Sequence, residues 1–179
     1  MSELVSPELY SLIEDNIRQI PDFPEAGVLF RDITPLLANG EVFAELIKAL
    51  AERYRGKVDA IAGIESRGFI LAAPLAVELG VGMVTIRKAG RLPGPVVGVD
   101  YDLEYGSARM ELQPFTVHEG QRVLVIDDVL ATGGTARASF ELIEQAGGVP
   151  VRFCVLIELE ALGGREKLAG YNVDAVCTY

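Results

Sequence analysis

The sequence predicts an α/β fold in which a mainly parallel central sheet is flanked by helices. Apolar, β-branched runs of strand length recur along the chain, and helical patterns alternate with them. Residues 123–126 are all apolar, which is typical of a strand that is buried on both faces. The chain has 179 residues and 50% of them are hydrophobic, so we expect a single domain over residues 1–179 with a substantial core.

The N-terminal part, up to about residue 35, predicts a small hood over the carboxyl edge of the sheet. Ser6 followed by Pro7 indicates the start of a helix, and apolar residues at helical spacing continue the pattern to Ile20. Residues 21–32 contain two prolines and a glycine. We therefore expect an irregular segment between this helix and the first element of the sheet domain.

The sequence after the N-terminal part predicts a helix over residues 41–54, followed by a β-α-β unit. Strands are expected over residues 58–64 and 82–86, and the helix between them over residues 68–79. Pro74 removes one backbone hydrogen bond from that helix and is expected to bend it. A strand, a helix crossover and a second strand place the two strands parallel to each other.

A loop and a second set of alternating elements complete the sheet. Residues 90–98 hold three glycines and two prolines, so a long mobile loop is expected there. The remaining expected strands cover residues 97–105, 108–113, 122–126, 151–159 and 173–178, and the remaining helices cover residues 135–146 and 161–169.

Composition excludes several classes of function. The net charge of −10 argues against a general binder of nucleic acid or of membrane surfaces. Cys154 and Cys177 lie in apolar runs and are interpreted as buried thiols in a reducing compartment. No apolar run approaches the length of a membrane span, and no basic segment precedes a hydrophobic one at the N-terminus. We therefore expect a cytoplasmic protein.

The most specific motif is Val123-Leu-Val-Ile-Asp-Asp-Val-Leu-Ala-Thr-Gly-Gly-Thr135. Its apolar strand leads into Asp127 and Asp128 at the strand's carboxyl end, where open α/β sheets bind ligands. The small residues that follow expose backbone N–H groups at the start of a helix, which is a favourable site for a phosphate. Carboxylates beside such a loop can accept hydrogen bonds from sugar hydroxyls or hold Mg²⁺.

This motif resembles the phosphoribosyl diphosphate motif of the type I phosphoribosyltransferases. Four further segments follow the order found in that family and narrow the resemblance to the adenine phosphoribosyltransferases. They are Phe23-Pro-Glu-Ala-Gly-Val-Leu-Phe-Arg-Asp-Ile33, Gly63-Ile-Glu-Ser-Arg-Gly-Phe69, Arg87-Lys-Ala-Gly-Arg-Leu-Pro-Gly94 and Tyr101-Asp-Leu-Glu-Tyr-Gly106. The resemblance implies a glycosyltransferase of purine salvage that converts adenine and phosphoribosyl diphosphate into AMP and pyrophosphate.

On the donor side, the resemblance implies that Asp127 and Asp128 bind the ribose hydroxyls. The residues implied to bind the 5′-phosphate are Ala131, Thr132, Gly133, Gly134 and Thr135. Val129 stands where the family usually has leucine, so it offers a shorter apolar surface to the base. Mg²⁺ is the implied cofactor, held mainly by substrate oxygens and water, so we expect no metal site built from protein ligands.

Pyrophosphate is implied to bind at two turns that each follow a strand. The first comprises Glu65, Ser66 and Arg67, and Arg67 is assigned to the catalytic residues. The second is a cluster of cations beside the glycine-rich loop, which suits an anion clamp in an acidic protein. Its members are Arg87, Lys88 and Arg91, with Ala89 where the family often has another cation.

On the base side, the resemblance implies that Phe30 stacks on adenine while the main chain of Leu29 and Arg31 reads its amino edge. A 6-oxo purine inverts this hydrogen-bond pattern and would leave buried groups unpaired. Glu104 is the implied general acid and base for the proton on N9 of adenine. Tyr105 is expected beside the ribose or the mobile loop.

Two other classes of function remain open at this point. A related enzyme could use another base, such as xanthine or orotate. A non-catalytic effector-binding module could use the same fold, although such a regulator usually needs an added DNA-binding domain and a basic face. Nucleotide triphosphate and dinucleotide sites lose support, because the turn at residues 63–68 lacks the Lys-Ser/Thr of a Walker loop and no G-x-G-x-x-G follows a strand. The family is dimeric, so a homodimer is expected.

Overall fold

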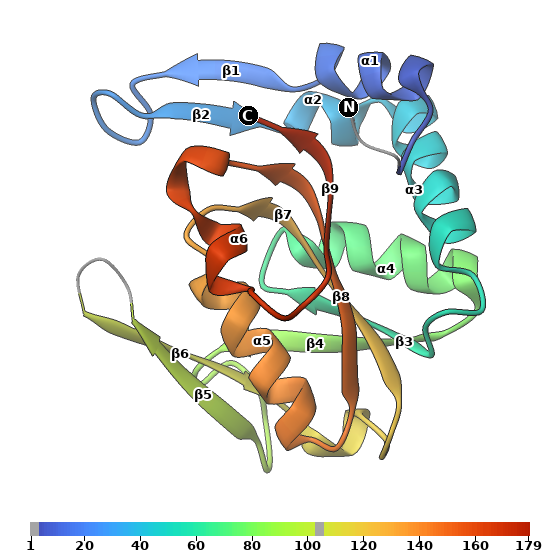
Figure 1. Cartoon of the computed structure of the whole chain (residues 1–179), viewed down its shortest axis with the longest axis vertical. Helices are drawn as coiled ribbons and strands as arrows, with labels where there is room; N and C mark the ends of the chain where they lie inside the picture. Colours follow the sequence, from blue (N-terminus) through green and yellow to red (C-terminus); the bar gives the residue numbers. More distant parts are fainter. Residues whose placement is uncertain (1–3, 103–105) are drawn as a thin grey trace.

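The computed structural model describes residues 4–102 and 106–179. A seven-stranded sheet with the order β5-β6-β4-β3-β7-β8-β9 forms its centre (Figure 1). Strands β4, β3, β7, β8 and β9 run parallel to one another, whereas β6 runs antiparallel to both β4 and β5. The predicted α/β fold with a mainly parallel sheet is confirmed.

The strands and helices follow the predicted order along the chain. The sheet strands are β3 (Ala60–Ile64), β4 (Gly82–Lys88), β5 (Val97–Asp102), β6 (Ser107–Leu112), β7 (Arg122–Leu130), β8 (Val149–Glu158) and β9 (Val173–Thr178). The helices of the sheet domain are α3 (Gly40–Tyr54), α4 (Gly68–Leu79), α5 (Gly134–Gln145) and α6 (Gly164–Lys167), with short 3-10 turns at Pro114–Thr116 and Glu160–Leu162.

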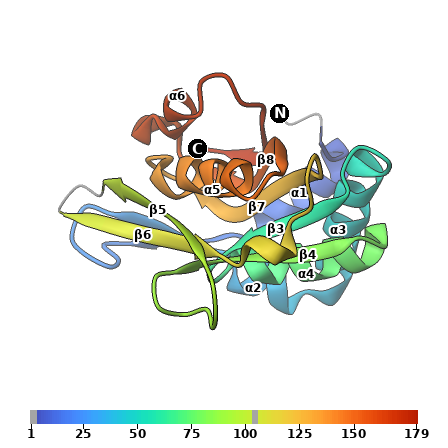
Figure 2. The same cartoon turned by 90° about the horizontal axis from the view of Figure 1, so that it is seen from below.

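Alternation along the central strands explains why helices cover both faces of the sheet. In β7, Leu124 and Ile126 pack with α3 and α4, whereas Val123 and Val125 pack with α5. Because successive side chains of a strand point to opposite faces, a run without polar residues needs a cover on each side. Figure 2 shows α5 above the sheet and α4 below it.

The described part of the hood lies at one end of the molecule and contains α1 (Pro7–Asp15), β1 (Arg18–Pro21), β2 (Leu29–Asp32) and α2 (Thr34–Ala38) (Figure 1). Two predictions for this region are wrong. The first helix ends at Asp15 rather than continuing to Ile20, and part of the expected irregular segment pairs as an antiparallel hairpin, β1 with β2. The hairpin pairs residues 18–21 with residues 29–32, and Arg18 also forms an ion pair with Asp32 across it at 2.8 Å.

Helix α2 was not predicted from the sequence. Asp32 begins it by accepting hydrogen bonds from the backbone N–H of Thr34 at 2.9 Å and from its hydroxyl at 2.6 Å. These bonds are the principal reason that the pKa of Asp32 is lowered, with Arg18 adding to the effect. The local signal is the polar residue two positions before Thr34-Pro35, a pattern typical of a helix start.

The connections between strands reverse direction between the neighbouring strands β3 and β7. From β3 the chain passes through α4 to β4 on one side, and from β7 it passes through α5 to β8 on the other. Open α/β sheets bind ligands at this kind of reversal, outside the carboxyl ends of the strands. The segments that follow β3 and β7 therefore flank the expected position of a ligand.

Several boundaries differ from the prediction by a few residues. Strand β7 continues to Leu130, because Asp127 and Val129 still pair with β8, so the two acids lie within the strand rather than after it. Helix α6 covers four residues where a longer helix was expected. Among the described residues, no helix is both long and apolar enough to cross a bilayer. Both cysteines are buried and unpaired.

Candidate active site

A pocket of about 500 Å³ lies at the carboxyl ends of β3, β4 and β7. All of its lining residues come from segments that the sequence assigned to donor binding. They are Glu65, Ser66, Arg67, Lys88, Arg91, Asp127, Asp128, Val129 and Ala131. Three segments far apart in the sequence thus meet in one pocket, because parallel strands deliver their following turns to the same edge of the sheet.

The two aspartates of β7 have different surroundings within the pocket. Asp128 is buried, and its Oδ2 lies 2.8 Å from Nε of Arg67. Asp127 accepts a hydrogen bond from the backbone N–H of Asp128 at 2.9 Å. Burial, followed by the charge of Asp128, raises the pKa of Asp127 well above its usual value. One acid is thus paired with a cation, while its neighbour holds a proton more tightly than a free aspartate.

The turn after β3 is joined to the end of β4 by Glu65. Its carboxylate accepts hydrogen bonds from the Arg87 guanidinium at 2.9 and 3.3 Å and from the Lys88 backbone N–H at 3.0 Å. The bonds from Arg87 are the main cause of a lowered pKa for Glu65. The Glu65–Ser66 peptide bond is cis. Arg87 itself donates to the carbonyl of Arg91 at 3.0 Å, so it braces the pocket wall that Lys88 and Arg91 line.

The phosphate-type loop, residues 131–135, is enclosed from two sides. A Cβ added at Gly134 would lie 3.1 Å from the ring of Tyr101 in β5, and one added at Gly133 would lie 2.5 Å from the carbonyl oxygen of Gly164 in α6. Gly133 also has a φ of 80°, a conformation that favours glycine. The glycines are therefore required both by the turn and by its close neighbours, and they leave little room for side chains around the start of α5.

The hood contributes an aromatic side chain next to the pocket. The guanidinium carbon of Arg67 lies 5.7 Å from the centre of the Phe30 ring, and Phe23 packs against the same ring edge-on at 5.2 Å. Arg67 therefore connects the hood to the acids of β7. Leu29 and Phe30 are not among the residues that line the pocket, so the structure brings them beside it rather than into it.

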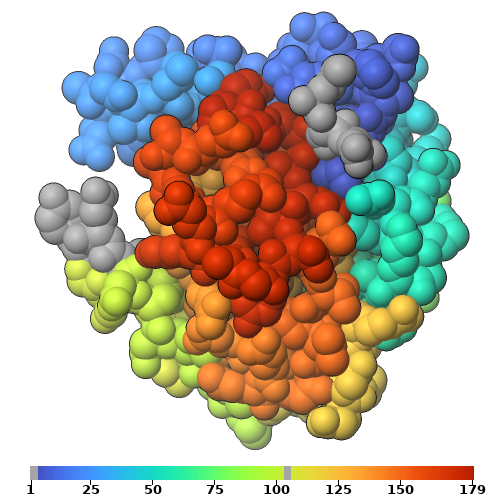
Figure 3. Space-filling view, in the orientation of Figure 1, coloured from blue at the N-terminus to red at the C-terminus, as the bar shows by residue number. Residues whose placement is uncertain are grey.

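Arg31 makes a contact that was not predicted from the sequence. Its guanidinium carbon lies 4.0 Å from the centre of the Tyr179 ring, within the range of a cation–π interaction. Nη1 of Arg31 is buried and has no hydrogen-bond partner among the described residues. Figure 3 shows the hood (blue) directly against the C-terminal segment (red). Tyr179 thus supports the strand that carries Leu29, Phe30 and Arg31.

Two predicted site residues, Glu104 and Tyr105, lie outside the described residues. Other residues near the site were missed, above all Gly164, Arg165 and Tyr179. The paired glycines at Gly163 and Gly164 gave a usable signal, because adjacent glycines after a core strand often mark a close approach of two backbones. Among the described residues, no group of three or more His, Cys, Asp or Glu side chains is arranged to hold a metal ion.

The sequence model of the phosphoribosyl transferase domain matches residues 32–176. An adenine phosphoribosyltransferase from Roseiflexus sp. (strain RS-1) is 54% identical over 168 residues, which cover 93% of this chain and 98% of that protein. The chain belongs to the adenine phosphoribosyltransferase family. The predicted family is confirmed.

Solved structures of the family have the same fold. The crystal structure of adenine phosphoribosyltransferase from Thermoanaerobacter pseudethanolicus superposes with a TM-score of 0.91 and 46% identity, covering 95% of this chain and 99% of that one. The Saccharomyces cerevisiae enzyme, complexed with an imino-altritol bisphosphate and adenine, gives a TM-score of 0.90 and 38% identity, covering 96% of this chain and 99% of that one.

Proposed function

We propose that this enzyme transfers the 5-phosphoribosyl group from phosphoribosyl diphosphate to adenine and releases AMP and pyrophosphate. The observation that carries the proposal is the pocket of about 500 Å³, whose lining joins the acids of β7 to the cations that follow β3 and β4. An aromatic side chain of the hood lies next to this lining. Acids for a ribose, cations for pyrophosphate and an aromatic ring for a base are the groups that this reaction needs.

Donor binding is assigned to the segments that follow β3, β4 and β7. Backbone N–H groups of residues 131–135 hold the 5′-phosphate at the start of α5. Asp127 and Asp128 accept hydrogen bonds from the ribose hydroxyls. Because Arg67 lies 2.8 Å from Asp128, the arrival of the hydroxyls releases its guanidinium for the pyrophosphate. Lys88 and Arg91, which line the same wall, stabilise the remaining charge of the pyrophosphate.

Adenine binding is assigned to the hood. The Phe30 ring stacks on the purine, and the main chain of Leu29 and Arg31 reads its amino edge. A backbone carbonyl accepts a hydrogen bond from the 6-amino group and a backbone N–H donates to N1. The support for this assignment is the position of Phe30 beside Arg67, together with the adenine named in the yeast complex.

The transfer exchanges one bond of the sugar for another. The bond between C1′ and the pyrophosphate oxygen breaks early, and the pyrophosphate leaves with that electron pair. N9 of adenine then bonds to C1′, and the N9 proton passes to a base, for which we propose Glu104. Arg67 and the backbone N–H groups stabilise charge on the leaving group, and the hood limits the access of water to the cationic sugar.

Mg²⁺ is the proposed cofactor. The pocket is lined by the carboxylates of Asp127 and Asp128, and the Glu65 carboxylate is occupied by Arg87 and the Lys88 backbone. Carboxylate oxygens are ligands of the kind that Mg²⁺ prefers. When bound to the donor, the ion would neutralise charge that develops on the pyrophosphate. We assign its direct ligands mainly to donor oxygens and water, with Asp127 and Asp128 acting through the ribose hydroxyls.

We further propose that the enzyme is a homodimer and works in the cytoplasm. Val77 is 82% exposed and Ile70 41% exposed on α4, beside an apolar groove of about 510 Å³ between α3 and α4. An exposed apolar surface of this kind is typical of an interface. The buried, unpaired cysteines support a reducing compartment such as the cytoplasm.

The proposed function is tested with a panel of bases assayed with phosphoribosyl diphosphate, with and without Mg²⁺. We expect AMP formation from adenine and at least about 100-fold lower kcat/KM for hypoxanthine, guanine, xanthine and orotate, because a 6-oxo group opposes the donor and acceptor order of the hood. Higher activity with another base would assign a different substrate. The absence of turnover with every base would favour a binding module.

A further inference from the structure

Helix α6 lies directly against the loop of residues 131–135, which we have assigned to the 5′-phosphate. A Cβ added at Gly164 would fall within van der Waals overlap of the Ala131 carbonyl oxygen and would lie 2.9 Å from the Leu130 side chain. In the opposite direction, the Gly164 carbonyl oxygen occupies the space that a Cβ at Gly133 would need. The backbones of α6 and the loop are therefore in contact, and a shift of α6 would move the loop.

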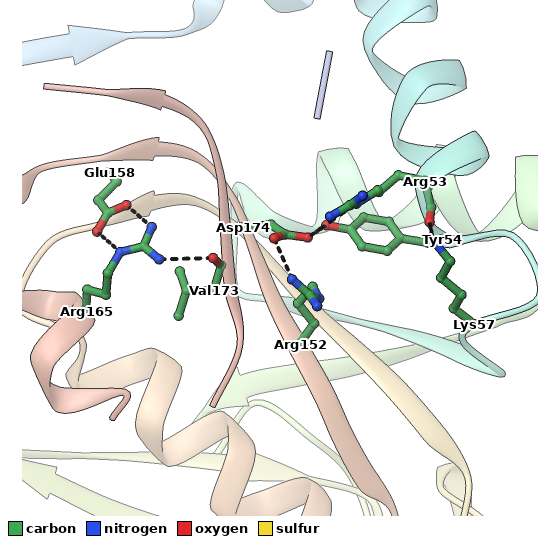
Figure 4. Close-up of polar contacts among 8 residues, drawn as sticks. All are labelled: Arg53, Tyr54, Lys57, Arg152, Glu158, Arg165, Val173 and Asp174. Carbon is green, nitrogen blue, oxygen red and sulfur yellow. Dashed lines mark hydrogen bonds and ion pairs between the residues drawn. The ribbon is translucent and has the colours of Figure 1, made fainter. Parts of the chain in front are cut away.

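Arg165 connects α6 to the sheet through its side chain. Arg165 forms a two-point ion pair with Glu158 at the end of β8, in which its Nε lies 2.8 Å from Oε1 and its Nη2 contacts Oε2 (Figure 4). Its third nitrogen, Nη1, donates to the backbone carbonyl of Val173 in β9 at 3.0 Å. A guanidinium that uses all three nitrogens in this way fixes both the position and the orientation of the helix that carries it.

The carboxylate partner is anchored to the strand that leads into the loop. Glu158 is only 3% exposed, and it pairs with Leu130 across β7 and β8. The next residue, Leu159, donates its N–H to the Leu130 carbonyl at 2.9 Å. Arg165, Glu158 and Leu130 thus form a continuous connection from α6 to the residue that precedes the loop. The Glu158 carboxylate is buried whereas the Arg165 side chain is 51% exposed, so removal of the arginine would leave a buried charge without its partner.

We propose that Arg165 and Glu158 are positioning residues for the 5′-phosphate subsite, which they set by holding Gly164 against the loop. This inference rests on the proposed function, because it takes residues 131–135 as the phosphate site. The alternative is that the pair only stabilises the β8–β9 edge. The two roles differ in which ligand is affected: a positioning role affects ligands with a 5′-phosphate, whereas a loss of stability affects every ligand alike.

The chain contains a matched control for this ion pair. Arg122 contacts Asp59 through Nε at 2.9 Å and Nη2 at 2.7 Å, and its Nη1 donates to the Gly56 carbonyl at 3.1 Å. The contact pattern is the same as that of Arg165. Arg122 begins β7, however, at the end of the strand opposite to the loop. Arg122→Met therefore removes the same pattern of contacts without touching the phosphate subsite, although its carboxylate partner is 42% exposed and that of Arg165 is 4% exposed.

The experiment compares Arg165→Met, Arg165→Lys, Gly164→Ala and Arg122→Met by calorimetry with ribose 5-phosphate, AMP and adenosine. We expect Arg165→Met to weaken ribose 5-phosphate and AMP by about 10- to 100-fold, since a displacement of about 1 Å in a site can cost that much. Binding of adenosine, which lacks the phosphate, should change less than about 2-fold. Arg165→Lys should restore part of the affinity, because lysine keeps the charge but not the planar fork.

Gly164→Ala provides an independent approach, since its methyl group pushes directly on the Ala131 carbonyl and leaves the ion pair intact. It should weaken the binding of ribose 5-phosphate and AMP and leave adenosine binding nearly unchanged. If Arg165→Met does not fold, Gly164→Ala and Arg165→Lys together test the inference. Equal weakening of all three ligands, or ribose 5-phosphate affinity like that of Arg122→Met, would overturn the inference. If the wild-type enzyme bound no ribose 5-phosphate at all, the proposed function itself would fail.

Discussion

At the scale of single residues, the properties of the site depend on the charges of Arg67, Asp127 and Asp128, which lie close together. Asp128 lies against Arg67, whereas Asp127 is close to Asp128 without a cation of its own among the described contacts. The raised pKa of Asp127 is the consequence, with burial as its main cause. The charged form of Asp127 is therefore unfavourable in the folded protein. Binding sites commonly keep such groups, although replacing them would stabilise the fold.

Asp127→Asn tests this balance. Asparagine cannot supply an anionic acceptor to the ribose, so we expect kcat/KM for the donor to fall by roughly 10²–10³-fold. Folding raises the pKa of Asp127, so the folded protein holds the proton more tightly than the unfolded chain does. Wild-type stability therefore decreases as pH rises from the unfolded-state pKa to the folded-state pKa. Asparagine has no such loss, so the variant should melt at a higher temperature than the wild type at neutral pH.

Melting curves from pH 4 to pH 8 measure the difference in melting temperature between Asp127→Asn and the wild type. The difference should become smaller toward acidic pH. Each unit by which folding raises the pKa of Asp127 corresponds to about 1.4 kcal/mol of unfolding free energy. A difference in melting temperature that does not vary with pH would show that the Asp127 carboxyl is not perturbed in the folded state. Near-normal kinetics in both Asp127→Asn and Asp128→Asn would remove these residues from the ribose subsite.

Tyr179 provides a prediction for the base side of the site. Removing its ring in Tyr179→Ala takes away the support under Arg31, worth roughly 0.5–2 kcal/mol, so the KM for adenine should rise about 3- to 10-fold. The KM for the donor should not change. Tyr171, which packs under Arg137 at 5.2 Å, offers a control, because Tyr171→Ala removes a similar contact away from the hood. A rise in KM for the donor and not for adenine would contradict the role of Tyr179.

At the scale of elements, the loop of residues 131–135 is held between β5 and α6. Gly134→Val would place a branched side chain against Tyr101 and crowd the N–H groups at the start of α5. We expect at least about a 10-fold loss of AMP affinity with little change in the fold. The double variant with Tyr101→Ala relieves the clash with the ring. If it recovers full affinity, the loss came from packing and not from blocked N–H groups.

The sheet elements were predictable from the sequence because their signals are local. Helix α4 and strand β9 occur at their predicted limits, since α4 begins at Gly68 and ends before Gly80, and β9 is a short, mainly apolar run. The hairpin β1–β2 was not predictable, because its strands gain their order by pairing with each other and through the ion pair of Arg18 with Asp32. Tertiary pairing of this kind overrides a helical pattern.

The candidate site could be predicted to a similar degree. Its lining residues come from contiguous motifs, and every one of them was named from the sequence. The contacts that support the lining were not, because Gly164 meets the loop, and Arg165 meets Glu158, only through folding. Residues such as these have no motif of their own at the level of a single sequence. The mobility of the loop after β4, which stands clear of the sheet in Figure 2, stays a prediction.

At the scale of the whole molecule, the apolar face of α4 predicts the oligomeric state. Val77 is largely exposed in the single chain, and a second copy would cover it. Val77→Asp should convert a dimer to a monomer in sedimentation experiments and leave the melting of the monomer nearly unchanged, as surface substitutions usually do. Phe115→Asp, at a second exposed apolar residue far along the chain, should remain dimeric. A monomeric wild type would refute the dimer, and a dimeric Val77→Asp would move the interface elsewhere.

In the proposed enzyme, a donor pocket at the carboxyl ends of β3, β4 and β7 lies next to a base-binding hood formed around β2. A crystal structure of the enzyme with AMP tests most directly whether the pocket and the hood form one site, because AMP would contact both. We predict the 5′-phosphate on the N–H groups of residues 131–135, the ribose hydroxyls on Asp127 and Asp128, and adenine stacked on Phe30. AMP bound with its purine away from the hood, or with its phosphate away from the start of α5, would contradict the account.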